Sequence, residues 1–450
     1  MVAKITGIIR FLTLLLLITC WVCRPVRAEG ITLITDAETQ KFLADIVGPL
    51  YKAAGIAFRP DHIYIVRDNS LNAFVSEGNN MFVHTGTLLE ADNVNELSGI
   101  LAHETGHIMG GHIVRQQLKI QKMRYVMLGS MIAAGAAAVS TGRGDAAMAI
   151  MLGSQSSALN SLLHYQTQEE RSADESAVKL LAQTHQSTVG LQNFMSKIRK
   201  RNALSGVSES PYFRTHPMTS ERISHFAEAG KNNHYPTAHK LDGEFLMIKA
   251  KLAAFLLDKQ KVMRLYPQSD NSPAGRYARS ILAYRSSNMN EALKLIDGLI
   301  AEQPQNPYFY ELKGQFLFES GQVGKSISAY ETALRLRPDN AILKTYLAQA
   351  MLENNPNKEQ LQRIILLLQQ AQIKIPTATG WQLLSRAYDM SERRADSLYA
   401  AAEFSYEIDN LEVAQKQLEN ARKAGADKSL SLKISDLEQR IKQELKERDF

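Results

Sequence analysis

Cysteine is almost absent from this 450-residue chain, and its two cysteines, Cys20 and Cys23, both lie close to the N-terminus. Residues 1–28 are predicted to be a signal peptide, because basic residues precede an apolar run and a small-residue cleavage site ends at Ala28. Cleavage would remove both cysteines. The mature chain would then need no disulfide in an oxidising compartment, and it could not bind a metal ion through thiolate.

Long apolar runs and basic stripes are also missing. The run from Phe11 to Cys23 is too short to span a membrane comfortably, so we expect cleavage to a soluble form rather than a retained anchor. Residues 1–28 contain four basic residues and no acidic residue, so cleavage would lower the formal net charge from +6 to +2. Because the remainder has no basic arm or stripe, nucleic-acid binding has no support.

The most informative segment is residues 103–107, which read His-Glu-Thr-Gly-His. Residues i and i+4 share one face of a helix, so His103 and His107 can direct two imidazole nitrogens at one zinc ion. Glu104 would lie beside the metal and can act as general base for a water molecule. The alternative is a helix whose two histidines and glutamate face solvent.

The residues around this segment favour a buried helix. Asn93 and Glu96 resemble a capping box at its start. An apolar stripe follows at helical spacing, formed by Leu97, Ile100, Leu101 and Ile108. A buried helix is where a ligand site is expected, whereas a solvated face is not.

A third metal ligand must come from another part of the chain. His112 is the nearest histidine, but a metzincin third histidine would fall one residue later, at Ile113. A glutamate on a second helix is the thermolysin-like way to complete two histidines. The acidic stretch in a second expected helix offers four carboxylates on spacing alone: Glu169, Glu170, Asp174 and Glu175. Acidic runs are often solvated helix faces, so the residues alone leave this ligand open.

Several segments, in order, resemble the CAAX prenyl protease and Oma1-like zinc peptidases. That family has HExxH followed by ExxAD, and residues 170–174 read Glu-Arg-Ser-Ala-Asp. Residues 72–89 resemble the strand pair that precedes the active-site helix in the family. Residues 215–217 and 220–223 match its THP…ERI segment. The family's glycine pair before the strand is not intact, because residues 76–78 read Ser-Glu-Gly.

The resemblance implies a role for each matching residue. One zinc ion per chain would be held by His103, His107 and Glu170, with Glu104 as the base. Asp174 would donate a proton or orient a ligand histidine. Separately, the extended run from Met81 to Thr85 is expected to form an edge strand that could pair with a substrate backbone; the alternative is an ordinary strand within the sheet.

Two downstream residues have alternative roles. A His-Pro pair in a polar loop is typically only a loop. A regulatory contact from His216 to the zinc would instead close its coordination and hold the enzyme latent. Arg222 is either a transition-state contact for a tetrahedral oxyanion or a salt-bridge partner.

An Ala-, Gly- and Met-rich stretch, residues 126–162, does not reach membrane-spanning length in either half. We expect it to form buried helices beside the active site. The alternative is an apolar lid that touches unfolded substrate or makes a peripheral contact with the membrane surface.

The second half of the chain repeats with a period of 34 residues, which is the tetratricopeptide period. Pro304 and Pro338 are 34 residues apart, and so are Ala292 and Ser326. In one copy the small, aromatic, small and proline positions of the consensus are filled by Gly314, Tyr330, Ala333 and Pro338. Such repeats stack helix pairs around a shared core and present a concave surface to peptides or protein partners.

We expect about four repeats, together with an irregular helix pair at residues 240–270 and a charged capping helix at the C-terminus. The alternative is a generic helical bundle. The predicted fold class is mainly α: a zincin-type (gluzincin) metallopeptidase domain with a small β-sheet, followed by an α-solenoid of tetratricopeptide repeats. The predicted domains are residues 29–240 and 241–450.

The family resemblance and the repeats together suggest a periplasmic zinc endopeptidase. Its clients would be unfolded or misassembled outer-membrane β-barrel proteins, and it would contact the barrel-assembly machinery. The alternative is a repeat-based chaperone or adaptor whose peptidase site is normally latent. The intact Glu104 argues against an adaptor that has lost its enzyme activity, because such a protein needs no base.

Overall fold

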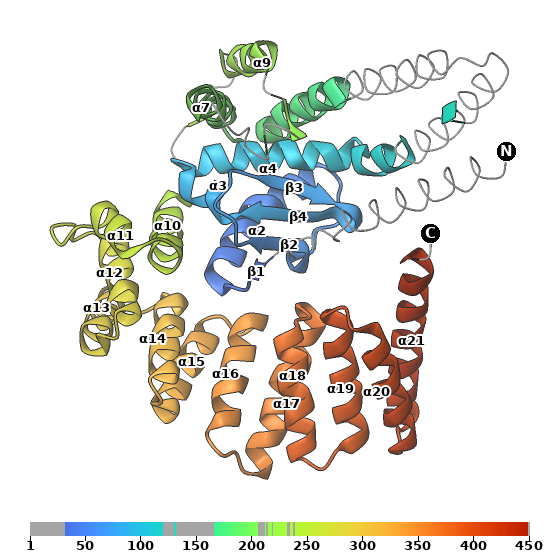
Figure 1. The fold of residues 1–450 in the computed structure, drawn as a ribbon. Helices are drawn as coiled ribbons and strands as arrows, with labels where there is room; N and C mark the ends of the chain where they lie inside the picture. Colours follow the sequence, from blue (N-terminus) through green and yellow to red (C-terminus); the bar gives the residue numbers. More distant parts are fainter. Residues whose placement is uncertain are drawn as a thin grey trace, which may run out of the picture. The chain divides into compact units, whose positions relative to one another are not determined.

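The computed structural model describes residues 32–119, 130–131, 166–205, 212, 215–217, 219–231, 235–236 and 239–448. The predicted signal peptide and almost all of the stretch 126–162 lie outside these residues. Within them the chain is mainly helical and contains one small sheet (Figure 1). Among the described helices, none is both long and apolar enough to cross a membrane.

The sheet has four strands in the order β1-β2-β4-β3. Their bounds are β1 Leu33–Ile34, β2 Ile63–Val66, β3 Ala73–Ser76 and β4 Asn80–His84. Strand β2 is parallel to β4, and β3 is antiparallel to it. The resemblance of residues 72–89 to a strand pair is therefore confirmed.

The expectation that the run from Met81 to Thr85 forms an edge strand is wrong. Residue Val83 of β4 pairs with Ala73 on one side and with Ile65 of β2 on the other. Strand β3 ends the sheet as the structure describes it, and it packs against α4 (Val94–Met109). The strand next to the active-site helix is thus β3.

The two faces of the sheet differ because side chains alternate along a strand. Ile63 and Ile65 of β2 point into the main hydrophobic core, which also contains buried side chains of α2 (Ala37–Ala53) and α4. The opposite face carries an aromatic ladder in which Phe82 stacks on Tyr64 and on Phe74, each with ring centroids 4.8 Å apart. All three aromatic side chains are half-buried.

The turn between β3 and β4 shows how the chain manages with a single glycine. Gly78 has φ +74° and Asn79 has φ +61°, so two successive residues adopt the left-handed conformation. Asparagine tolerates this region better than other side chains do. Asparagine next to the one glycine therefore completes the left-handed part of this turn.

Further described helices of the N-terminal half include α3 (Thr85–Glu90), α7 (Val189–Ser205), α9 (Ser220–Lys231) and a helix over residues 166–183. Helix α7 packs on α4, and α9 packs on α7. Two short 3₁₀ turns lie at Pro60–His62 and Glu77–Asn79.

From residue 242 onward the chain forms successive helices. They are α10 (Asp242–Leu256), α11 (Lys259–Leu265), α12 (Pro273–Arg285), α13 (Met289–Glu302), α14 (Pro307–Glu319), α15 (Val323–Leu336), α16 (Ala341–Glu353), α17 (Lys358–Lys374), α18 (Ala378–Met390), α19 (Arg394–Glu407), α20 (Leu411–Lys423) and α21 (Lys428–Arg448). Neighbouring helices pack in pairs, and the starts of α12, α14 and α16 are 34 residues apart. The predicted repeats are confirmed, and α10 with α11 forms the irregular pair.

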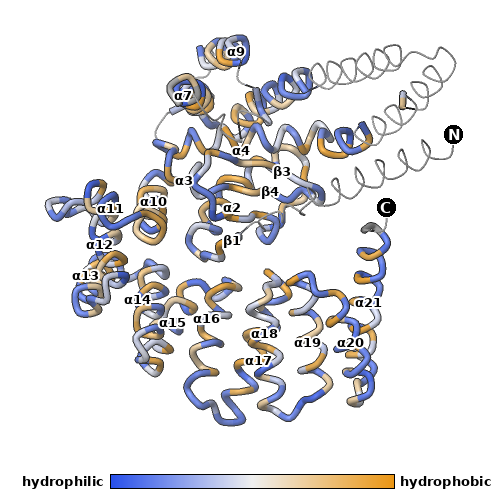
Figure 2. Tube along the Cα trace, in the orientation of Figure 1, coloured by the Kyte–Doolittle hydropathy of each residue, from blue (hydrophilic) through white to orange (hydrophobic). Residues whose placement is uncertain are grey.

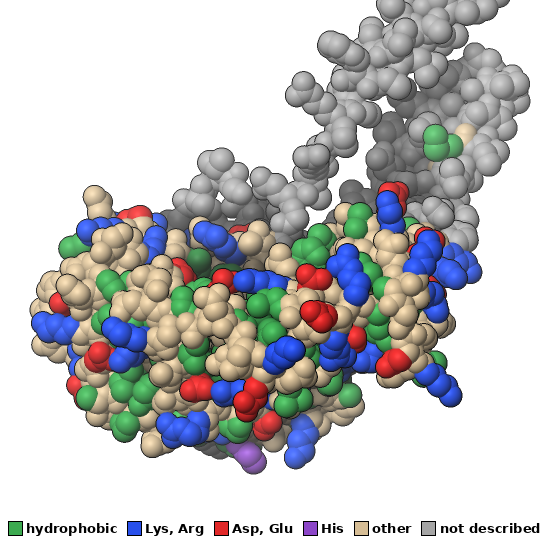
Figure 3. Space-filling view, turned by 90° about the horizontal axis from the view of Figure 1, so that it is seen from below, with side chains coloured by type: hydrophobic (Ala, Val, Ile, Leu, Met, Phe, Trp, Pro, Cys, Tyr) green, Lys and Arg blue, Asp and Glu red, His purple; other side chains and the backbone are tan. Residues whose placement is uncertain are grey.

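The consensus positions make the helix contacts that the repeat pattern predicted. A Cβ atom on Gly314 would lie 2.7 Å from the Tyr330 ring, so only glycine allows this approach. Ala333, on the same helix as Tyr330, is fully buried. Hydrophobic and hydrophilic residues alternate along the helices (Figure 2), and on the face shown in Figure 3 basic, acidic and apolar side chains are interspersed.

Helix α10 belongs to two hydrophobic cores. Phe245 and Ile248 pack in the core of the sheet and α4. Ala250 and Ala254 of the same helix pack with Tyr277 and other residues of the first repeats. One helix therefore connects the interior of the N-terminal half with the interior of the repeats.

A buried ionic cluster lies where α10 meets the start of α2. Lys251, 5% exposed on its side chain, forms an ion pair with Asp36 and lies 3.4 Å from Glu38 and 3.3 Å from Glu311 of α14. The Tyr277 hydroxyl donates to Glu38 at 3.0 Å. Three buried carboxylates thus share one lysine.

The excess of carboxylates has an electrostatic consequence. Burial raises the pKa of Glu311 to about 7, although Lys251 opposes the shift. Burial would also raise the pKa of Asp36, but the ion pair with Lys251 lowers it below its usual value. Lys251 itself has a pKa well above its usual value, because the carboxylates around it outweigh its burial.

We therefore predict that Glu311 makes stability pH-dependent. A carboxyl whose pKa is raised on folding favours the folded state below its unfolded pKa, and this contribution is lost as pH rises through the folded pKa. The free energy of unfolding of the metal-free protein should fall between about pH 4.5 and 7 more steeply for wild type than for Glu311→Gln. Urea unfolding at a series of pH values measures this difference.

Glu331→Gln provides the control, because Glu331 is exposed and pairs with Arg363 at the surface. Its pH profile should follow that of wild type. Parallel profiles for wild type and Glu311→Gln would contradict the assignment.

Candidate metal centre

Helix α4 carries the HExxH segment and is buried over most of its length. Its N-cap is Asn93, whose side chain accepts the backbone N–H of Glu96 at 3.1 Å, as predicted. The reciprocal bond of the capping box differs, because the Glu96 carboxylate accepts the N–H of Asp92 at 3.0 Å. His103 and Glu104 are at most 1% exposed. The alternative of a solvated His-Glu-His face is therefore excluded.

The helix of residues 166–183 crosses α4 at very close range. A Cβ atom on Gly106 would lie 2.7 Å from the carbonyl oxygen of Ala173. The glycine inside the HExxH segment thus allows the second helix to approach, and this contact brings Glu170 and Asp174 to the two histidines. Glu169 and Glu175, the other two candidates, lie outside the group of converging ligand atoms described next.

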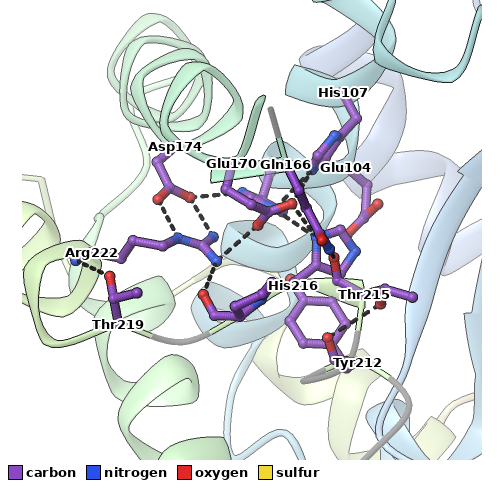
Figure 4. Close-up of polar contacts among 12 residues, drawn as sticks. Glu104, His107, Gln166, Glu170, Asp174, Tyr212, Thr215, His216, Thr219 and Arg222 are labelled. Carbon is purple, nitrogen blue, oxygen red and sulfur yellow. Dashed lines mark hydrogen bonds and ion pairs between the residues drawn. The ribbon is translucent and has the colours of Figure 1, made fainter. Parts of the chain in front are cut away.

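Four buried side chains converge on one point: His103, His107, Glu170 and His216, whose ligand atoms all lie within 4.8 Å of one another (Figure 4). His103 Nε2 is 3.4 Å from Glu170 Oε2. His107 Nε2 is 3.3 Å from Glu170 Oε1, and His216 Nδ1 is 2.9 Å from the same oxygen. The sequence predicted each of these residues as a metal contact.

The contacts of His103 leave its Nε2 as the ring nitrogen that can bind a metal ion. Its Nδ1 lies 2.9 Å from Asp174 Oδ1, and Arg222 donates two bonds to the same carboxylate at 2.6 and 2.7 Å. An ionised carboxylate only accepts, so Nδ1 of His103 carries the proton that faces Asp174, and Nε2 is the nitrogen that would give its lone pair to a metal ion once the ring is neutral. The Nε2 atom of His107 is only 3.1 Å away. Two imidazole nitrogens and one carboxylate converging in this way form a donor set suited to a divalent metal ion.

Charge in the metal-free protein is balanced within the same cluster. Burial would raise the pKa of Glu170, but His216, His103 and His107 hold it well below its usual value. Burial would lower the pKa of His103, but Asp174 and Glu170 raise it to about 9. Burial lowers the pKa of His107 to about 3. Glu170 is therefore ionised and available as a ligand.

Glu104 lies on the same helix turn as His103 and faces the cluster. Its Oε1 is 3.6 Å from His216 Nε2. Burial raises the pKa of Glu104, with His216 and His103 opposing the shift. A general base works best when its pKa lies near the working pH, so a raised pKa suits a carboxylate that lies beside the metal ligands.

Hydrogen bonds and ring packing hold the loop that carries His216 (Figure 4). The ring of buried Tyr212 lies with its centroid 4.5 Å from that of His216, and the His216 N–H donates to the Tyr212 carbonyl at 2.7 Å. Gln166 donates to the carbonyl of Thr215 at 2.7 Å, and Arg222 donates to that of Pro217 at 2.9 Å. Tyr212 was not predicted from the sequence, because an aromatic residue in a polar loop carries no metal-site signal.

Arg222, near the start of α9, joins both carboxylates of the second helix. Besides its bonds to Asp174, its Nη1 lies 2.8 Å from Glu170 Oε2. Burial would lower the pKa of Arg222, but Asp174 and Glu170 raise it above its usual value. The structure therefore shows the salt-bridge alternative, and a transition-state contact remains a prediction.

His112 is not one of the converging ligands. Its Nδ1 lies 2.9 Å from Nδ1 of His107, the ring nitrogen on the other side from the one near Glu170. The spacing argument against His112 as third ligand is consistent with this position.

Comparisons with known proteins agree with this geometry. Residues 37–229 match peptidase family M48, and residues 277–341 match the tetratricopeptide repeat. The N-terminal half thus contains a domain that matches peptidase family M48, which supports a metalloprotease, and repeats of the tetratricopeptide type follow it. The resemblance drawn from the HExxH and ExxAD segments is thereby confirmed, and so is the predicted order of the peptidase domain and the repeats.

Curated relatives span most of the chain. The beta-barrel assembly-enhancing protease of Yersinia pestis is 25% identical over 404 residues, which is 84% of this chain and 78% of the relative. The protein of the same name from Escherichia coli K12 is 24% identical over 387 residues, 82% of this chain and 76% of the relative. The metalloprotease LoiP of E. coli K12 is 29% identical over 207 residues, 46% of this chain and 76% of the relative.

Arg222 and Arg171 provide a matched test of the buried charge balance. Arg222→Met would leave two buried carboxylates without their cation, so the metal-free protein should lose about 3–5 kcal/mol in its free energy of unfolding. Arg171 pairs with Glu221 at 2.7 Å on the surface, and Arg171→Met should cost about 0–1 kcal/mol. Urea unfolding of both variants gives the comparison. Equal costs would show that Arg222 does not balance the buried carboxylates.

Proposed function

We propose that the protein is a periplasmic zinc-dependent endopeptidase that acts in the quality control and assembly of outer-membrane β-barrel proteins. The observation that carries the proposal is the buried convergence of His103, His107 and Glu170 beside Glu104. The name of the relatives, beta-barrel assembly-enhancing protease, supports the class of client. Degradation of misfolded or stalled clients, contact with the barrel-assembly machinery and the periplasmic location belong to this proposal.

Zinc is the metal that best suits the donor set. Two neutral imidazoles and one carboxylate are the ligands of thermolysin-like catalytic zinc sites, and the mature chain would contain no thiolate. His103, His107 and Glu170 would hold the ion. When bound, zinc supplies Lewis-acid polarisation of a peptide carbonyl and lowers the pKa of a water molecule.

The protein's own residues perform the proton transfers. Glu104 takes the proton of the water that attacks the peptide carbonyl and passes it to the leaving amine. Asp174 holds the proton of His103 on Nδ1, so that Nε2 of His103 stays available as a ligand. Its bonds to Arg222 keep Asp174 fixed and ionised.

Strand β3 supports a substrate-binding role. It ends the sheet and packs against α4, so an extended client segment that pairs with β3 would run alongside the helix that carries His103 and Glu104. Main-chain pairing of this kind gives affinity with little sequence preference. A peptidase for unfolded clients needs such tolerance.

His216 supports a latent state. Its Nδ1 lies among the ligand atoms, while its Nε2 is 3.6 Å from the base Glu104. In this position the imidazole occupies the space between the ligands and the base, where an attacking water would have to lie. A fourth protein ligand closes a zinc site and prevents it from activating water. Activity would therefore require the loop of residues 215–217 to withdraw.

The same observation favours a second function for the repeats. A chain whose peptidase site is normally closed could still bind clients through its solenoid as a chaperone or adaptor. Hydrolysis and binding can be separated by a variant that keeps the metal ligands but lacks the base.

Casein hydrolysis by the purified mature protein tests the proposal. Glu104→Gln should abolish cleavage, because no carboxylate remains to accept the water proton, and His216→Ala should raise cleavage above wild type. Release of soluble peptides measures the rates. If none of the three proteins cleaves casein although each binds one zinc ion, the chaperone function is favoured instead.

Metal content tests the ligand assignment. His103→Ala, His107→Ala and Glu170→Gln should each lose bound zinc after dialysis, as measured by mass spectrometry of the metal. Glu169→Gln is the matched control, because Glu169 precedes Glu170 on the same helix but is not among the converging ligands, and its Oε1 lies 3.8 Å from Arg115 Nε. Loss of zinc from Glu169→Gln but not from Glu170→Gln would overturn the assignment.

A further inference from the structure

His112 occupies a buried position behind the second histidine of the HExxH segment. It is 3% exposed, and its Nδ1 lies 2.9 Å from Nδ1 of His107. The two imidazole rings meet edge to face, with centroids 4.8 Å apart. The proposed function gives this residue no part.

The turn at the end of α4 is shaped to return this ring to the helix. A Cβ atom on Gly110 would lie 2.2 Å from Nε2 of His112 and within 2.7 Å of two ring carbons, so any side chain at this position would displace the imidazole. Gly111 adopts φ +62°, a conformation that L side chains rarely adopt. Both glycines are needed to place His112 against His107.

The hydrogen bond between the two Nδ1 atoms fixes a tautomer. One of the two nitrogens must carry the proton and the other must accept it. If His107 is to bind a metal ion through Nε2, its proton lies on Nδ1, and Nδ1 of His112 accepts it. A neutral His112 ring can accept the proton in this way, because one of its two ring nitrogens then presents a lone pair.

We propose that His112 is the positioning residue for the metal ligand His107, holding it in the tautomer and orientation that turn its Nε2 toward Glu170. Each of the two ligand histidines then has its own support, since Asp174 accepts the Nδ1 proton of His103 in the same way. This inference rests on the proposed zinc site. Such supporting residues typically change metal affinity by about 10–100-fold.

A matched pair of variants separates the hydrogen bond from the packing. His112→Asn keeps an acceptor oxygen where Nδ1 now lies, whereas His112→Phe keeps a buried ring without an acceptor. Zinc affinity, measured by competition with a chromophoric chelator, should weaken about 10–100-fold in His112→Phe and stay close to wild type in His112→Asn. His225→Phe, an exposed position on α9, is the control and should bind zinc as wild type does.

Two further measurements keep the inference testable if a variant fails to fold. Gly110→Ala leaves His112 in the chain but displaces its ring, so it should weaken zinc affinity in the same direction. Nitrogen NMR of the wild-type zinc protein should show the His107 proton on Nδ1. A proton on Nε2 of His107, or equal zinc affinity in His112→Phe and wild type, would overturn the inference.

The outcome also distinguishes this inference from the proposed function. A wild-type protein that binds no zinc would defeat the proposed function itself. A wild-type protein that binds zinc tightly, with His112→Phe equally tight, would defeat only the assignment of His112.

Discussion

The burial of two carboxylates on one helix is the constraint that organises the metal centre. Glu170 and Asp174 are 3% and 2% exposed, and an uncompensated charge in such a place would cost several kcal/mol. Arg222 therefore comes in from α9, and imidazoles come from α4 and from the loop of His216. The same negative charge that demands these partners makes the site attractive to a divalent cation. The same arrangement of side chains therefore balances the buried charge and forms the metal site.

Much of this centre follows from local sequence, because helical spacing alone places two histidines and a glutamate on adjoining faces. Spacing cannot identify the residues that hold the metal ligands in place. The spacing of His112 bears only on whether it could be a metal ligand. Nothing in the sequence indicates that Tyr212 packs on His216. The edge strand was also misplaced, since the pairing of a four-residue strand such as β3 depends on its neighbours and not on its own pattern.

The repeats were predictable for a different reason. The repeat period shows which positions must carry small residues. Gly314, which packs against Tyr330, is one such position. The buried cluster around Lys251 has no comparable signal, because its carboxylates come from positions 36, 38 and 311, far apart along the chain. Only the folded chain brings them to one lysine.

Helix α10 contributes side chains to two hydrophobic cores, and this affects how the protein can be divided into fragments. A fragment that stops at residue 240, the domain boundary suggested by the sequence, would omit Phe245 and Ile248 and leave a hole in the core behind the sheet. A fragment that starts at residue 241 would keep the helix but expose that same apolar side to water. Neither half is therefore expected to behave as an autonomous folding unit, because each would lose apolar contacts that α10 makes with the other.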